Sequence, residues 1–476
     1  MCGRGRWGTT FTSVFVEDEP RQRRFGAQGY AMSMNKRQFD VVVIGGGTAG
    51  VVAAVQAGRA GAKTLLVEKV GMLGGTTTVG GVNFPGLFHA WGRQVIAGIG
   101  WELVTRCVAE SGGVLPDFAN YQCPHWQLQI RVNRFVYAAL CDEAVCDAGV
   151  DVLFHTMLAD VMPEAEGRGW QLTLCTKGGL TEIGAAVVVD ATGDANAAAL
   201  AGLPLHIPDE NQPATLAYQA SGYDVADLDM DTINRAFDAE VRAGHLSYTD
   251  ASWSTTEPNI GRWLHGYGTQ ANHIHHINAR DSEGKTRLEL ESRRSLLRLY
   301  RFLRQQPGLE NLVIEQVSPE CGVRETATIQ GKATVTVEDY QSGRLWEDAV
   351  CHSFYPIDLH ISSGTGLDMK PLAEGVVPTI PRAALLPAGS QGFIVAGRCI
   401  SSDRLANSAL RVQATSMATG QAAGAMASLS VASGLEVEEL SMSDVHALLR
   451  EHGAIVPGDS SYSAEPSREV EMGEIG

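Results

Sequence analysis

The sequence lacks the features that define several classes of protein. Its 476 residues contain no run of eighteen apolar residues, the length that a helix needs to cross a membrane. Its nine cysteines form no C-x-x-C pair and no zinc-binding spacing. Basic residues are few, because 37 Lys and Arg stand against 54 Asp and Glu, for a formal net charge of −17. This balance argues against nucleic acid and anionic membranes as partners, and the scattered cysteines indicate a reducing, cytoplasmic location.

What the chain does contain is a strong nucleotide-binding pattern between Phe39 and Lys69. Residues 40–44 form a β-branched apolar run typical of a buried parallel strand. The next six residues fill G-x-G-x-x-G, a small-residue helix follows to about Ala60, and Glu68 ends a second strand. Such a unit binds a pyrophosphate at the helix N-terminus and a ribose at the acid, whereas a glycine-rich turn in another α/β protein is the weaker alternative. The residues expected to contact the nucleotide are Gly45, Gly47, Thr48, Ala49, Gly50, Glu68 and Lys69.

Three further segments have the character of cofactor contacts. A glycine-rich loop at 71–81 follows the acid directly and is too rich in glycine for a helix or strand. The strand 186–190 runs into the turn Ala191-Thr192-Gly193-Asp194, and a third strand near 392–396 runs into Gly397-Arg398. An Ala- and Gly-crowded helix from about 409 to 429 comes next, and its glycines predict tight packing on a sheet.

The length and the shifts in composition predict a divided chain. From 204 to 385 glycines become fewer and most histidines occur, which favours an inserted domain. We therefore expect an α/β fold in which a Rossmann-like domain with a parallel sheet is interrupted by an α+β substrate domain. The expected parts are a disordered leader at 1–37, the two pieces of the nucleotide-binding domain at 38–203 and 386–457, the insertion at 204–385, and a disordered tail at 458–476. Further expected elements are helices at 94–111, 131–149, 282–305 and 442–451, a strand at 150–155, and a hairpin of 169–175 with 181–190.

Taken together, these segments resemble the bacterial FAD-dependent oxidoreductase family, within the two-domain flavoproteins of the glutathione-reductase type. The resemblance covers Phe39 to about Val456 and rests on VVIGGGTAG, LGGTTTVGGVNFPG, VVVDATGDANAAALAG, GVRETATIQGKATVTVEDYQSG, YPIDLH and VAGRCISSDRLANSALRVQATSMATGQAAG. It implies FAD as the cofactor. It also implies that the fingerprint glycines hold the FAD pyrophosphate and Glu68 the ribose, and that further contacts come from Gly74, Gly75, Thr76, Gly193, Asp194, Gly397, Arg398, Arg411, Val412 and Gln413.

A second G-x-G-x-x-G after a strand is missing, so we expect no separate NAD(P)H domain and poor reduction by NADH or NADPH. In this respect the chain differs from the disulfide reductases. Cys141 and Cys146 have the C-x4-C spacing of a redox pair, but they lie in an amphipathic helical stretch and are interpreted as ordinary thiols. The resemblance implies an FAD-dependent dehydrogenase or oxidase that takes a hydride from a small hydroxylated sugar, polyol or amine. Oxygen, a quinone or a protein would accept the electrons, and a homo-oligomer stays open.

Such a reaction needs a base that takes a proton as the hydride leaves carbon. His360, which the resemblance places on the substrate side of the flavin, is the first candidate, and His89, after the glycine loop, is the second. Arg324 could orient an anionic group or pair with Glu325. The run NHIHHIN at 272–278 suggests a metal, but no third ligand is evident and no metal is expected. A flavin-dependent desaturase or isomerase and a non-catalytic FAD-binding protein remain as alternatives.

Overall fold

The computed structural model describes residues 37–164, 169–269 and 271–458. The expected leader at 1–37 and tail at 458–476 lie outside these residues, apart from their bordering residues 37 and 458. Within the described ranges, no helix is long and apolar enough to cross a membrane.

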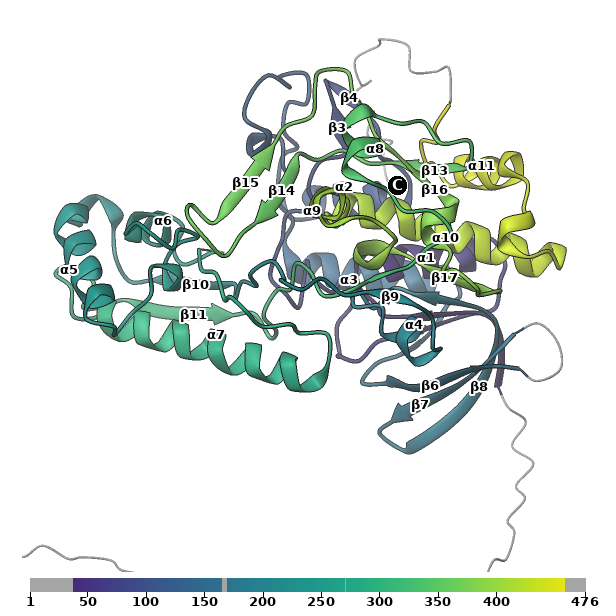
Figure 1. The fold of residues 1–476 in the computed structure, drawn as a ribbon, viewed down its shortest axis with the longest axis horizontal. Coiled ribbons are helices and arrows are strands. Elements are labelled where there is room, and N and C mark those ends of the chain that lie inside the picture. Colours follow the sequence, from purple (N-terminus) through teal and green to yellow (C-terminus); the bar gives the residue numbers. More distant parts are fainter. Residues whose placement is uncertain (1–36, 165–168, 270, 459–476) are drawn as a thin grey trace, which may run out of the picture. The chain divides into compact units, whose positions relative to one another are not determined.

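A seven-stranded sheet forms the centre of the nucleotide-binding part (Figure 1). Its strand order is β5 (Asp151–Leu153), β2 (Thr64–Val67), β1 (Arg37–Ile44), β8 (Gly179–Asp190), β7 (Trp170–Thr176) and β6 (Met157–Pro163). Strand β17 (Phe393–Val395) pairs with the last residues of β8, which lie beyond those that pair with β7. Strands β5, β2, β1, β8 and β17 are parallel, whereas β7 and β6 extend the sheet as antiparallel strands. The sheet confirms the predicted α/β class.

The buried strand β1 supplies side chains to two hydrophobic cores. Val41 and Val43 belong to the core that contains the long helices, whereas Val42 and Ile44 belong to the core on the opposite face of the sheet. Because successive side chains of a strand point to opposite faces, a strand covered on both faces needs a continuous apolar run. This requirement explains the sequence of β1.

Helices α1 (Thr48–Arg59) and α10 (Gln413–Ser433) pack closely against each other. A Cβ atom placed on Gly420 would lie 2.2 Å from the carbonyl oxygen of Ala49. A Cβ atom on Gly424 would lie 2.2 Å from that of Ala53. The glycines that weaken α10 as an isolated helix therefore permit its contact with α1.

Two predicted helices differ from the observed ones. The helix expected at 409–429 is divided, because Val412 has an extended backbone (ψ 151°) between α9 (Arg404–Leu410) and α10. The helix expected at 94–111 begins only at Ile99, as α2 (Ile99–Glu110). Its first residues form β4 (Arg93–Gln94) against β3 (His89–Ala90), and Gly98, with a φ of +86°, turns the chain into the helix.

A further group of helices and strands agrees with the predictions to within a few residues where one was made. They are α3 (Arg134–Asp147), α4 (Asn196–Leu200), α8 (Val337–Ser342), α11 (Met442–Glu451), β9 (Leu205–His206), β12 (Thr328–Ile329), β13 (Ala349–His352) and β16 (Thr379–Pro381).

Residues between about 214 and 321 surround a hydrophobic core of their own, which includes the buried Trp263. Figure 1 shows the elements of this region gathered together: β10 (Tyr218–Ser221), β11 (Val313–Val317), α5 (Met230–Arg242), α6 (Ile260–His265) and α7 (Ser282–Leu303). The hairpin β14 (Ile357–His360) and β15 (Leu367–Lys370) follows later in the chain. The inserted domain and its boundaries 204 and 385 stay a prediction.

Candidate functional site

The N-terminus of α1 is buried and has no capping group. Its N-cap is Gly47, no side chain caps the helix, and the first turn contains no acidic residue. The first three helical residues, Thr48, Ala49 and Gly50, are buried. The first N–H groups of a helix have no partner within it, so a buried start of this kind requires an acceptor from elsewhere. A phosphate oxygen meets that requirement and is favoured by the helix dipole.

The glycines around this helix start permit close backbone contacts that a side chain would prevent. A Cβ atom on Gly50 would lie 1.8 Å from the carbonyl oxygen of Gly45. The loop at 71–81 lies directly against this turn, because the Gly74 N–H donates to the Gly46 oxygen (2.9 Å). A Cβ atom on Gly75 would lie 2.7 Å from the Cα of Gly47. The two glycine-rich segments that the sequence linked to one cofactor are therefore adjacent.

Glu68 directly follows β2 beside this turn, and its side chain is buried. Its carboxylate accepts hydrogen bonds from the N–H groups of Gly46 (2.6 Å) and Val70 (2.9 Å). Burial raises the pKa of Glu68, and these two hydrogen bonds oppose the rise. A carboxylate has about four lone-pair positions, so acceptor capacity remains for a ribose hydroxyl. Lys69, by contrast, is exposed and pairs with Glu320 (3.3 Å).

The second and third predicted segments meet at Arg398. Its guanidinium donates to the Gly193 carbonyl (2.7 Å) and to the Asp194 carboxylate (2.6 Å). The neighbouring Gly397 has a φ of +83°, and a Cβ atom there would lie 3.0 Å from the Cβ of Ala49 in α1. Both segments thus lie close to the first turn of α1.

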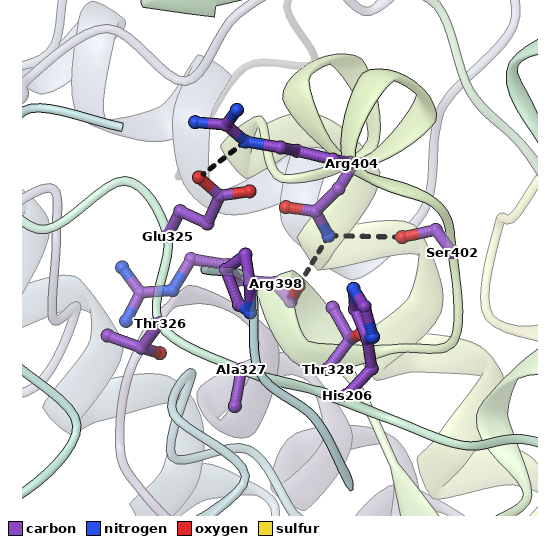
Figure 2. A pocket seen from close by; sticks show the side chains of 10 residues that line it. His206, Glu325, Thr326, Ala327, Thr328, Arg398, Ser402 and Arg404 are labelled. Atoms are coloured by element: carbon purple, nitrogen blue, oxygen red, sulfur yellow. Dashed lines mark hydrogen bonds and ion pairs between the residues drawn. The ribbon is translucent and has the colours of Figure 1, made fainter. Parts of the chain in front are cut away.

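A pocket opens next to Arg398 (Figure 2). Figure 2 shows Arg404 paired with Glu325 in this pocket, at 3.3 Å. The pocket is lined by His206, Pro208, Glu325, Thr326, Ala327, Thr328, Arg398, Ser402, Arg404 and Asn407. Both of its arginines are paired with carboxylates, so the pocket has no uncompensated positive charge.

The start of α10 contacts the glycine loop through Gln413. The Thr77 hydroxyl donates to the Gln413 side-chain oxygen, and the Gln413 amide donates to the Val82 carbonyl (2.7 Å). Thr76 is exposed, and its carbonyl accepts the Val82 N–H (3.0 Å). Val412 lies beside the segment that follows this loop, because a Cβ atom on Gly86 would be 3.5 Å from the Val412 Cβ. The predicted flavin contacts at 74–76 and 411–413 therefore belong to one region.

His360, at the end of β14, lies in a cluster of polar side chains. Its Nδ1 is 2.8 Å from His273 Nε2, and its Nε2 is 3.5 Å from Asp358 Oδ2. Burial, together with the charge of Arg324, lowers the pKa of His360 to about 3, although Asp358 opposes the shift. Burial by itself would raise the pKa of Asp358, but His360 and the nearby arginines lower it to about 2. His360 is therefore neutral and Asp358 ionised at neutral pH.

Two arginines face this cluster. Arg411, the C-cap residue of α9, donates to the Asp358 carbonyl (3.1 Å) and to the Gln212 side-chain oxygen (3.3 Å). Arg324 donates to the Pro213 carbonyl (2.6 Å) and to the Thr215 hydroxyl (2.9 Å). The possible pairing of Arg324 with Glu325 is not formed, since Glu325 pairs with Arg404 instead.

Several buried polar atoms of the cluster have no hydrogen-bond partner among the described residues. They include Gln212 Nε2, Asn272 Nδ2, His273 Nδ1 and Arg411 Nε. Gln212 and His273 are 3% and 1% exposed, so bulk solvent does not reach these groups. An unsatisfied buried donor costs about 1–3 kcal/mol, and such a concentration of them indicates a binding site.

His89, the second candidate base, lies in a different environment. Its ring stacks on Phe118 (3.7 Å between ring centroids) and meets the edge of Trp101 (5.3 Å). Burial lowers the pKa of His89 to about 4. These contacts are those of a packed core side chain.

Sequence reasoning missed Gln212, His273, Trp253 and Asp358 as members of the cluster. The Trp253 ring stacks on His273 and meets the edge of His360 (4.8 Å). The only signal in the sequence was the i, i+2 spacing of Asp358 and His360, and His273 was considered only as a metal ligand. Across the described ranges, no group of three or more His, Cys, Asp or Glu side chains is placed to hold a metal ion.

An uncapped, glycine-lined helix start beside a buried acid, on a parallel sheet, defines a nucleotide-binding α/β protein. The family model described as FAD dependent oxidoreductase matches residues 40–449. The chain belongs to this family of FAD-dependent oxidoreductase enzymes, and FAD is its cofactor. The residues fit that group, because the N-terminus of α1 offers donors for a pyrophosphate and a Cβ atom on its N-cap Gly47 would meet only the Gly75 Cα, at 4.0 Å.

Curated relatives match only short stretches of the chain. Dihydrolipoyl dehydrogenase of Trypanosoma brucei brucei is 53% identical over 11% of this chain and 11% of its own length. The mitochondrial dihydrolipoyl dehydrogenase of Pisum sativum is 44% identical over 16% of this chain and 15% of its own. The chain thus matches about a tenth to a sixth of the length of these relatives.

Solved structures match more of the chain than the curated relatives do, but with lower sequence identity. A geranylgeranyl bacteriochlorophyll reductase-like protein from Thermoplasma acidophilum is 15% identical, with 87% of this chain and 84% of that chain covered and a TM-score of 0.42. The p-nitrophenol 4-monooxygenase of Pseudomonas putida DLL-E4 is 11% identical with the same coverage and a TM-score of 0.37. Likeness at this level says nothing about the reaction of this chain.

Proposed function

We propose that the protein oxidises a small polar metabolite, such as a hydroxylated sugar, polyol or amine, by transfer of a hydride to N5 of FAD. Oxygen, a quinone or a protein then accepts the electrons. The observation that carries this proposal is the cluster of His273, His360 and Asp358, which has unsatisfied buried donors and lies next to Arg411 at the start of α10. A general base and a flavin contact are adjacent in such an arrangement.

In this proposal the predicted residues divide into cofactor and substrate groups. The N-terminus of α1 and the glycine turn hold the pyrophosphate, Glu68 holds the ribose, and residues 74–76 and 411–413 lie along the flavin. The FAD, when bound, supplies the hydride acceptor. Arg411 and the start of α10 would supply positive potential beside the flavin when it is bound.

His360 accepts the substrate proton in this scheme, and the scheme requires one particular tautomer of its ring. Its Nδ1 lies 2.8 Å from His273 Nε2, so the scheme requires Nδ1 to carry the proton and donate it to His273. Only then is Nε2 free to accept a proton, with Asp358 positioned to stabilise the imidazolium that forms. In the other tautomer Nε2 donates to Asp358 and His360 cannot act as a base. His273 is therefore a positioning residue.

The remaining parts of the proposal concern the whole protein. We place it in the glutathione-reductase type of two-domain flavoproteins, with residues 204–385 as the substrate domain. The eight described cysteines form no disulfide, which supports a reducing, cytoplasmic location. A homo-oligomer remains open.

The test is anaerobic mixing of the purified holoenzyme with a panel of sugars, polyols and amines while the flavin absorption is recorded. Lasting bleaching by one of them supports dehydrogenation. A desaturase would bleach only with a substrate that loses hydrogens from adjacent carbons, and an isomerase would convert its substrate without lasting bleaching. A protein that only binds FAD would respond to none. Rapid reduction by NADPH would contradict the expectation that no NAD(P)H site exists.

A further inference from the structure

The charges around His360 do not balance. Arg324 and Arg411 both act on this histidine, and Asp358 is the carboxylate that faces them. The ion pair between Arg411 and Asp358 is long, at 3.5 Å. Burial, and then the charge of Arg411, lowers the pKa of the Arg324 guanidinium to about 9. Two partly buried cations thus share one anion.

Arg324 is the cation without a partner. Its two hydrogen bonds go to the Pro213 carbonyl and the Thr215 hydroxyl, which orient the guanidinium but leave its charge uncompensated. Among the described residues no carboxylate forms an ion pair with it. The two arginines that lie nearby in the pocket of Figure 2 do have such partners, Asp194 for Arg398 (2.6 Å) and Glu325 for Arg404 (3.3 Å). Partly buried charges are normally paired, so the site of Arg324 requires an anion.

Neighbouring N–H donors of Gln212 and Arg411 also require an acceptor. The side-chain oxygen of Gln212 accepts hydrogen bonds from the backbone N–H of His360 (3.1 Å) and from the Arg411 guanidinium (3.3 Å). These bonds fix the amide in place. Its amide nitrogen and the Arg411 Nε are buried, with no acceptor among the described residues. A ligand that satisfies a guanidinium and two fixed N–H donors supplies negative charge and several acceptor oxygens. Carboxylate and phosphate groups have this chemistry, and both match the planar fork of arginine.

We propose that the substrate carries an oxyanion group, a carboxylate or a phosphate, which Arg324 binds while Gln212 and Arg411 supply further hydrogen bonds. This inference rests on the proposed function and narrows it from polar metabolites in general to hydroxy acids, amino acids or phosphorylated polyols. For a hydroxy acid, the C–H bond breaks and its hydride reduces oxidised FAD. The O–H bond breaks with its proton going to His360, and a C=O bond forms. The anionic group itself does not react and serves to position the carbon.

The test compares ligands that differ only in the anionic group. Oxidised holoenzyme is titrated anaerobically with lactate and with propane-1,2-diol, and with glycerol 3-phosphate and with glycerol. Binding is measured by thermal unfolding and by the change in flavin absorption. We expect the anion of at least one pair to bind at least tenfold more tightly than its neutral partner. The pair that does so distinguishes a carboxylate from a phosphate site. Equal binding of the neutral partners, or no response to either anion, overturns the inference.

Variants connect this preference to Arg324. Arg324→Gln is expected to weaken binding of the preferred anion by about 10- to 100-fold, the effect of losing a charged hydrogen-bond partner. Arg324→Lys keeps the charge and retains part of the affinity. Arg235→Gln, on the exposed face of α5, is the matched control and changes nothing. Unchanged anion binding by Arg324→Gln overturns the inference, and the wild-type comparison decides the matter if this variant does not fold.

Failure of the inference and failure of the proposed function give different results. If neutral polyols alone bleach the flavin, the enzyme is a dehydrogenase and the oxyanion inference is wrong. If anions bind selectively but no metabolite bleaches the flavin, the oxyanion site stands and the proposed reaction is wrong.

Discussion

Both ring nitrogens of His360 have neighbours, and this fixes what its replacement should do. His360→Asn removes the Nε2 acceptor that lies 3.5 Å from Asp358. We expect flavin reduction to slow by about 10²–10⁴-fold, the usual contribution of a general base, while FAD content and reoxidation stay unchanged. Stopped-flow absorption measures the two half-reactions separately.

Two further variants test the assignment. His273→Gln retains an acceptor for the His360 Nδ1 proton and should be less impaired than His273→Ala, as expected of a positioning residue. His89→Asn should reduce at the wild-type rate. If His89→Asn is slow and His360→Asn is fast, His89 is the base. If both variants are fast, neither histidine is the base.

Glu68 is the residue with which the proposed ribose contact is tested. Glu68→Ala should weaken FAD retention by about 1–3 kcal/mol, because a buried hydroxyl loses its acceptor. The N–H groups of Gly46 and Val70 lose theirs as well. Glu68→Gln, which keeps one side-chain oxygen, should have a smaller effect. Dialysis followed by flavin fluorescence of the filtrate measures retention, and a Glu68→Ala variant that keeps its FAD as wild type does would exclude this role.

At the scale of the residue, the sequence predicts the local contacts and misses the distant ones. The glycine turn and Glu68 are recognisable because all their determinants lie within about thirty residues. The partners of His360 are not, since Gln212 is 148 residues away and His273 is 87. No local pattern marks a residue whose role depends on a contact formed only after folding.

At the scale of the element, the contact between α1 and α10 has a specific requirement for glycine. Gly420→Ala would place a methyl group 2.2 Å from the Ala49 carbonyl oxygen, and the two helices would have to separate. Overpacking of this kind costs about 1–3 kcal/mol of the free energy of unfolding, in spite of the better helix propensity of alanine. Thermal unfolding of the holoenzyme should show a lower Tm.

The matched control is Gly261→Ala in α6, where the nearest atoms to a Cβ would be 3.9 Å away. Its Tm should stay equal or rise, because alanine restricts the unfolded chain. Equal Tm values for the two variants would show that α1 and α10 do not pack as closely as described.

The differences between predicted and observed helices have one cause. Val412 is a permissible helix residue, and only the tertiary environment gives it an extended backbone between α9 and α10. The pairing of β4 with β3 likewise removes Arg93 and Gln94 from the helix expected at 94–111. In both cases tertiary contacts override a local preference that is worth only tenths of a kcal/mol per residue.

At the scale of the molecule, buried neutral histidines should make the protein sensitive to acid. Burial lowers the pKa of His89 and of His275 to about 4 and that of His360 to about 3. The unfolded chain therefore binds protons below about pH 6.5 that the native state does not bind until lower pH. Since the unfolded state binds more protons in this window, the free energy of unfolding falls as the pH falls from about 6.5 towards 4.

His89→Phe isolates one of these contributions. Phenylalanine preserves the stacking on Phe118 and does not titrate. Between pH 7 and pH 5, the free energy of unfolding should therefore fall by about 2 kcal/mol less in the variant than in wild type. Urea unfolding at the two pH values, with FAD in excess, gives this difference, and titrations common to both proteins cancel. An equal loss in His89→Phe would mean that His89 takes up its proton in the native state, and it would then be a candidate for catalysis again.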